Sequence, residues 1–253
     1  MMKVAMLHLA LSAGPAAVNL RRLQTGIEQA AAAGADWVIT PETALQGYFF
    51  AGHNPATELT AAVSLLTAQA ARHRITLFLG LAERDTASGK QYNSCLVVSP
   101  QGILGRHRKL RRVGTAEAWA AKGRRCRPIA TALLKAGILI CADLWYPEHA
   151  AALARQGAEV IVAPAAWPPG TCGPADCWER ASAAAALPVW VCNQTGCHQQ
   201  LDFRRAESVV AAAGKTLLRY SGEAAVLLFD WDTAGGRLLS RQFGIRPAGG
   251  EET

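Results

Sequence analysis

The sequence has no apolar run near the roughly 20 residues that a membrane-spanning helix requires. It also lacks the even, closely spaced cysteines of a small disulfide-stapled domain, because its seven cysteines are an odd number in a chain of 253 residues. We therefore expect no membrane contact, free thiols in a reducing compartment, and a cytoplasmic protein. Repeats and low-complexity linkers are absent as well, so we expect one domain over residues 1–253.

The first residues, MMKVAMLHLALSAGPAA, contain a lysine, an apolar stretch and small residues, and they superficially resemble a signal peptide. However, His8 interrupts the apolar stretch. We interpret this segment as the first strand of the fold.

Basic residues are only in modest excess, with 26 basic and 19 acidic residues and a net charge of +7. Hydrophobic residues make up 51% of the chain, which is enough for a sizeable core. The densest basic run is RHRKLRR, residues 106–112. A module that binds nucleic acid or another anionic partner is an alternative hypothesis, but such modules repeat basic and aromatic positions over a surface. Because these arginines cluster in one segment, we expect no nucleic-acid partner.

Strand and helix patterns alternate along the chain, which indicates an α/β fold with some antiparallel hairpins. Asn19 is a candidate N-cap for the first helix, and Pro147 is suited to the first position of the third. The expected helices span 19–35, 57–74, 147–158 and 177–187. The expected strands span 3–11, 36–40, 75–84, 136–143, 159–167, 188–196 and 223–232, and the hairpins span 92–109 and 207–220.

Three apolar strands each deliver a reactive side chain at their carboxyl end: Glu42 in DWVITPETALQGY, Lys109 in GILGRHRKL and Cys141 in GILICADLWYPE. Ligands in α/β folds bind where such strand ends converge. A thiol needs activation, which a carboxylate can supply by taking its proton and an ammonium by stabilising negative charge. Composition alone does not bring these residues together.

The motifs PETALQGY, HRKL and GILICADLWYPE, in this order, resemble the signatures of the nitrilase, or carbon–nitrogen hydrolase, superfamily. The similarity runs from about residue 3 to about residue 232 and includes the hairpin YNSCLVVSPQGILGRHRK. The chain departs from the family at four places: His107 and Ala142, where aromatics are common, and the segments DFRRAES and AAAGK.

The resemblance implies a four-layer α-β-β-α sandwich with mixed sheets, and a homodimer or higher homo-oligomer. It implies a catalytic triad of Glu42, Lys109 and Cys141, with the backbone N–H of Ala142 as an oxyanion donor. Glu117, eight residues after Lys109, matches the second glutamate of the family, which orients the substrate amide and the lysine. Neither a metal nor an organic cofactor is implied.

The activity that the resemblance implies is an amidase that releases ammonia from a small carboxamide through a cysteine thioester. Three alternatives remain: a nitrilase on a nitrile, an N-carbamoyl amide hydrolase with the same triad, and an inactive homologue. Arg111 and Arg112 suggest an acidic substrate, such as a dicarboxylate monoamide.

Other residues have a structural and a functional interpretation. Aromatic residues near the strand ends either line a substrate pocket or only pack; they are Tyr48, Phe49, Trp145, Tyr146 and Trp167. Four later cysteines and a histidine could ligate zinc, but their spacing is poor for a compact site; they are Cys172, Cys177, Cys192, Cys197 and His198.

Overall fold

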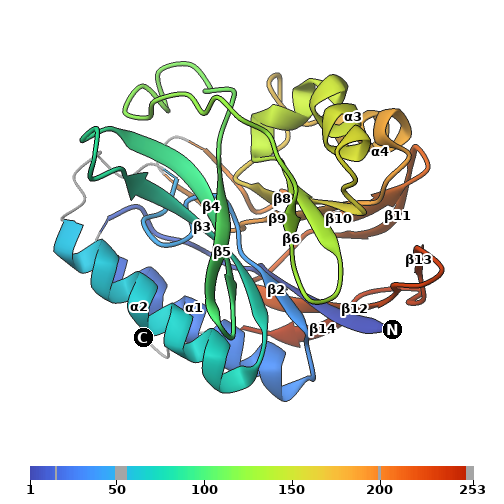
Figure 1. The fold of residues 1–253 in the computed structure, drawn as a ribbon, viewed down its shortest axis with the longest axis horizontal. Coiled ribbons are helices and arrows are strands. Elements are labelled where there is room, and N and C mark those ends of the chain that lie inside the picture. Colours follow the sequence, from blue (N-terminus) through green and yellow to red (C-terminus); the bar gives the residue numbers. More distant parts are fainter. Residues whose placement is uncertain (15, 49–55, 199–200, 249–253) are drawn as a thin grey trace.

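The computed structural model describes residues 1–14, 16–48, 56–198 and 201–248. Two β-sheets lie face to face, and one pair of helices covers the outer face of each sheet (Figure 1). The layers therefore run α-β-β-α, and the predicted sandwich with mixed sheets is confirmed. Within the described ranges, none of the helices is both long and apolar enough to cross a membrane.

The first sheet has eight strands, in the order β13-β12-β1-β2-β3-β4-β5, with β14 also paired to β12. Strands β1, β2 and β3 are parallel to one another, whereas the remaining pairs are antiparallel. The strands are β1 Met2–His8, β2 Trp37–Ile39, β3 Thr76–Arg84, β4 Gln91–Ser99, β5 Gly102–Arg108, β12 Ala225–Asp232, β13 Arg237–Leu238 and β14 Gly244–Pro247.

The second sheet has six strands, in the order β11-β10-β9-β8-β7-β6. Its centre is parallel, because β7, β8 and β9 run in the same direction. The strands are β6 Ile129–Ala130, β7 Lys135–Ile138, β8 Val160–Ala165, β9 Val189–Asn193, β10 Ser208–Ala212 and β11 Lys215–Tyr220.

Helices α1 (Ala16–Ala32) and α2 (Ala56–His73) pack on the first sheet, and α3 (Pro147–Arg155) and α4 (Cys177–Ala185) pack on the second. The prediction that Asn19 caps α1 is wrong, since the helix begins at Ala16. The buried Asn19 side chain instead accepts a hydrogen bond from the Ser12 N–H (3.0 Å) and donates one to the Ser12 carbonyl (2.7 Å). It therefore holds the segment that leads into the helix.

The core lies between the sheets and under the helices. Along β1, Val4 and Met6 pack into the inter-sheet core, whereas Ala5 and Leu7 pack under α1 and α2. Both faces of this strand are buried, which explains why its sequence is continuously apolar. Trp190 is central between the sheets, where its ring makes T-shaped contacts with the rings of three other aromatic residues at 5.2–5.8 Å; they are Trp37, Phe229 and Trp231.

Candidate active site

Glu42 follows β2 of the first sheet and bonds to the second sheet. Its N–H donates to the Ala165 carbonyl at the end of β8 (3.3 Å), and its Oε2 accepts from the N–H of Ala166 (3.0 Å). Its Oε1 accepts from Asn93 Nδ2 on β4 at 2.7 Å. The carboxylate is completely buried. It is thus held from both sheets at the seam between them.

Lys109 follows β5, where alternation along the strand separates the basic run into two sets. His107 and Lys109 are buried, whereas Arg106 and Arg108 turn outward and pair with Glu83. Because period-2 alternation divides the run in this way, RHRKLRR does not form one continuous basic face.

The Lys109 ammonium lies between two carboxylates. Its Nζ is 2.5 Å from Glu42 Oε1 and 2.5 Å from Glu117 Oε1. Glu117 is itself held by the Tyr48 hydroxyl, which donates to Oε1 at 2.9 Å, and by the Val113 N–H, which donates to Oε2 at 3.2 Å. All three charged side chains are essentially inaccessible to solvent. The structure therefore brings Glu42, Lys109 and Glu117 together.

Cys141 begins the short 3-10 helix η1 (Cys141–Trp145), three residues beyond the end of β7. Its φ is +48°, in the left-handed region that costs a non-glycine residue about 1 kcal/mol or more. Such strain is often found at functional sites because it aims a side chain out of the regular structure. The expected strand over 136–143 is thus too long, since the chain turns at the thiol.

Asp143 ties this turn to the lysine segment. Its Oδ1 accepts from the N–H groups of residues 110 and 111 (3.0 and 2.8 Å), and its Oδ2 accepts from the N–H of Ile140 (3.1 Å). The Nε2 of His107 lies 3.1 Å from the same Oδ2. The carboxylate is fully buried, so these bonds fix the segment carrying Lys109 against the one carrying Cys141.

Burial is the largest single influence on the pKa values of Glu42, Lys109 and Cys141. Burial raises the pKa of Glu42 to about 7; the Lys109 charge and a hydrogen bond with Cys141 lower this pKa, and the Glu117 charge raises it. Burial and the neighbouring Glu42 charge raise the pKa of the Cys141 thiol well above its ordinary value. Burial alone would lower the pKa of Lys109, but the negative groups around it raise it. Near neutral pH the site therefore holds a protonated thiol, an ammonium and a carboxylate able to gain or lose a proton.

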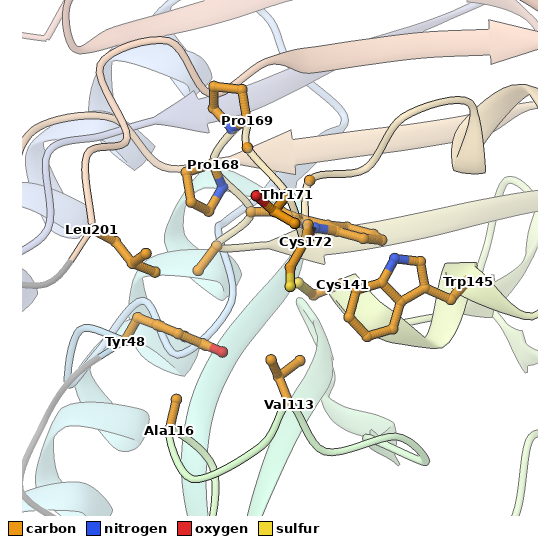
Figure 2. A pocket seen from close by; sticks show the side chains of 14 residues that line it. Tyr48, Val113, Ala116, Cys141, Trp145, Pro168, Pro169, Thr171, Cys172 and Leu201 are labelled. Carbon is orange, nitrogen blue, oxygen red and sulfur yellow. Dashed lines mark hydrogen bonds between the residues drawn. The ribbon is translucent and has the colours of Figure 1, made fainter.

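Cys141 lines a cavity of about 450 Å³. Figure 2 shows Trp145 on one side of the cavity, Tyr48 and Leu201 on the other, and Pro168 and Pro169 together beyond them. Its walls are formed by Tyr48, Val113, Ala116, Trp145, Ala166, Trp167, Pro168, Pro169, Gly170, Thr171, Cys172, Gly173 and Leu201.

Among the predicted substrate-binding aromatics, Tyr48, Trp145 and Trp167 line this cavity, but Tyr146 does not. The Tyr146 ring is instead covered by the Arg111 guanidinium, 4.0 Å from the ring centroid. A substrate-binding role for Tyr146 stays a prediction without support from the lining of this cavity. Phe49 lies outside the described residues.

The structure also bears on the predicted oxyanion donor and on the candidate zinc ligands. Ala142 is buried directly after Cys141, and its role as an oxyanion donor stays a prediction. Cys192 is buried in β9, where its Sγ contacts the Ile39 carbonyl at 3.2 Å, so it serves packing. In the part of the chain that the structure describes, no three His, Cys, Asp or Glu side chains are arranged to hold a metal ion.

Several site residues were not predicted from the sequence. Asn93 bonds Glu42, and no sequence signal pointed to this contact, because Asn93 stands among other polar residues at the start of its strand. The Ala166 N–H and the wall residues Val113, Pro168 and Leu201 carry no chemical signal, because backbone donors and apolar side chains look alike everywhere in a sequence.

Comparison with known proteins gives the family and the fold of the chain. A family model described as carbon-nitrogen hydrolase matches residues 3–235. An (R)-stereoselective amidase from Pseudomonas sp. is 32% identical over 64% of this chain and 59% of its own length. A nitrilase from Pyrococcus abyssi is 30% identical over 58% of each chain. The solved NitN amidase from Neterenkonia sp. AN1 superposes with a TM-score of 0.84 at 22% identity, covering 92% of this chain and 94% of that one.

The family model and the fold together define a hydrolase class whose members act on carbon–nitrogen bonds. This chain belongs to the carbon–nitrogen hydrolase family. The alignments span 59% and 58% of the lengths of the two curated relatives.

Proposed function

We propose that this protein is an amidase that hydrolyses a small carboxamide to a carboxylic acid and ammonia through a thioester on Cys141. The observation that carries the proposal is the shared ammonium: Lys109 Nζ lies 2.5 Å from both Glu42 and Glu117, and burial and the Glu42 charge raise the pKa of the Cys141 thiol. A thiol, a base and a cation thus meet beside a cavity that can hold a small molecule.

The first half-reaction consumes the amide. Glu42 takes the thiol proton while the sulfur attacks the carbonyl carbon, a general-base step for which a pKa near 7 is well suited. Lys109 Nζ and the Ala142 N–H then stabilise the tetrahedral oxyanion, and each such donor contributes about 3 kcal/mol. Protonated Glu42 returns its proton to the leaving nitrogen, the C–N bond breaks, and ammonia departs.

The second half-reaction restores the enzyme. Glu42 removes a proton from water, which attacks the thioester carbon, and the same donors hold the second oxyanion. The C–S bond breaks, the sulfur regains the proton, and the acid leaves. Glu117 positions the Lys109 head throughout, since a displacement of about 1 Å can cost about 100-fold in rate.

Ammonia release from a panel of amides, nitriles and N-carbamoyl compounds tests the proposal. We expect turnover of at least one amide, together with a thioester adduct on Cys141 in the intact mass of rapidly quenched protein. Cys141→Ala is the control and should lose both signals while retaining its circular dichroism spectrum. Turnover of nitriles alone, or activity that survives in Cys141→Ala, contradicts the amidase proposal.

A further inference from the structure

The described residues that line the cavity beside Cys141 carry no charge. Among the described residues that line it, the side chains are aromatic, aliphatic, or small and uncharged, and no Lys, Arg, His, Asp or Glu is among them. We propose that this cavity selects amides with a neutral, apolar acyl group and rejects amides whose acyl chain ends in a carboxylate. The inference rests on the proposed amidase function, which it deepens by naming the substrate class.

The cations near this cavity in the described structure are engaged elsewhere. Lys109 Nζ lies 2.5 Å from each of two carboxylates, and its remaining N–H is the one that the proposed mechanism gives to the oxyanion. The Arg111 guanidinium lies over the Tyr146 ring, and Arg112 Nη1 donates to the Ala120 carbonyl at 3.0 Å. Neither arginine lines the cavity. The hypothesis of a dicarboxylate monoamide, suggested by these two arginines in the sequence, therefore finds no counter-ion among the described residues that line the cavity.

A carboxylate placed in this cavity would lose hydration without gaining a cationic partner from the described lining, which is unfavourable. The site adds a second penalty, since Glu42 and Glu117 both act electrostatically on Cys141 and the single Lys109 cation offsets only one of the two negative charges against a further anion. An apolar acyl chain meets neither penalty, and the burial of its surface away from water contributes favourable free energy to binding.

The aromatic wall is rigid and can accept such a chain. The Trp145 and Trp167 rings pack edge to face at 5.2 Å, and Trp167 packs in the same way on Trp178 at 5.3 Å. The Trp167 backbone N–H donates to Asn193 Oδ1 (2.9 Å), and its indole N–H donates to the Cys172 carbonyl (2.7 Å). Because the polar atoms of Trp167 are already bonded, its ring offers the substrate only apolar surface.

The decisive test compares two amides of equal chain length, hexanamide and the monoamide of adipic acid, in which the terminal methyl is replaced by a carboxylate. We expect kcat/KM for hexanamide to exceed that for adipic monoamide by about 100-fold or more. Along acetamide, butanamide and hexanamide, kcat/KM should rise by about fourfold per added methylene until the cavity is full. A ratio within about threefold, or no rise with chain length, overturns the inference.

Binding measured without turnover separates this inference from the proposed function. In Cys141→Ala, quenching of tryptophan fluorescence reports occupancy, because Trp145 and Trp167 line the cavity. Tighter binding of hexanamide than of adipic monoamide supports the selectivity even if no amide is hydrolysed, and equal binding overturns it. Ammonia released from both amides at equal rates would instead support the amidase and remove the selectivity.

A charge-insertion variant probes the same wall. Leu201→Arg adds a cation to the cavity, and we expect the hexanamide-to-adipic-monoamide ratio of kcat/KM to fall by about tenfold or more. Leu217→Arg adds the same charge at an exposed position on β11 and should leave the ratio unchanged. An unchanged ratio in a folded Leu201→Arg variant contradicts the assignment of this wall.

Discussion

Among single residues, Lys109 has the largest expected effect, because its buried ammonium pairs with both Glu42 and Glu117. Lys109→Met would leave Glu42 and Glu117 buried without their cation, and breaking a buried pair typically costs about 3–5 kcal/mol. We expect a lower free energy of unfolding in urea by about that amount. We also expect kcat/KM to fall by at least about 100-fold, because the oxyanion loses a donor.

Lys122→Met is the matched control for this variant, because Lys122 is exposed. It should change neither the urea midpoint nor kcat/KM. Near-normal activity in Lys109→Met would remove Lys109 from the mechanism.

The pKa of Glu42, raised by burial to about 7, predicts the acid limb of the pH profile. Glu42 must be ionised to accept the thiol proton, so activity is present above this pKa and is lost below it. We expect log kcat/KM to fall with a slope of one per pH unit below about pH 7. Circular dichroism at each pH checks that the protein stays folded.

Asn93 offers a directional check on this assignment. Its hydrogen bond stabilises the ionised carboxylate, so Asn93→Ala should move the limb to higher pH. A limb that does not move, or a profile that is flat from pH 5 to 8, would mean that another group controls the acid side.

At the scale of elements, β3 approaches the loop that carries Glu42 because Gly80 has no side chain. A Cβ on Gly80 would stand 2.1 Å from the Pro41 carbonyl oxygen, which is backbone and cannot move aside alone. We expect Gly80→Ala to cost about 1–3 kcal/mol of stability. By displacing Glu42, it should also lower kcat/KM by about tenfold or more.

Gly105→Ala on β5 is the comparison for this substitution. Its Cβ would meet only the flexible Ile129 side chain, at 3.1 Å, so both effects should be small. Equal losses of activity in the two variants would show that the loop is not held through Gly80.

At the scale of the whole molecule, we propose that the two sheets and their helices unfold as one domain. Trp190 lies between the sheets, and replacing a buried Trp by Ala typically costs about 3–5 kcal/mol. We expect Trp190→Ala to lower the midpoint of thermal unfolding by about 10 °C while keeping a single transition. Leu217→Ala, at an exposed position, is the control.

Two separate transitions, of which Trp190→Ala shifts only one, would contradict the single domain. The homo-oligomer that the family resemblance implies also stays a prediction. Sedimentation velocity of the wild-type chain measures it directly.

Much of the fold could be predicted from the sequence, because periodicity is a local property. Apolar spacing and turn residues predicted the hairpin of β4 and β5 and the helices α2, α3 and α4. They also predicted where the central strands lie along the chain. The short edge strands β6, β13 and β14 were not predicted, since two to four residues carry no readable period. Asn19 was misassigned because a polar residue at a helix start resembles a cap even when distant backbone groups bind it.

The family, the candidate triad and most elements along the chain could be read from the sequence, because each lies in a short run of neighbouring residues. The folded chain was needed to show that one ammonium joins Glu42 and Glu117, and that the described residues lining the cavity are uncharged. These features depend on contacts between residues far apart in the chain, and such contacts exist only once the two sheets have packed together.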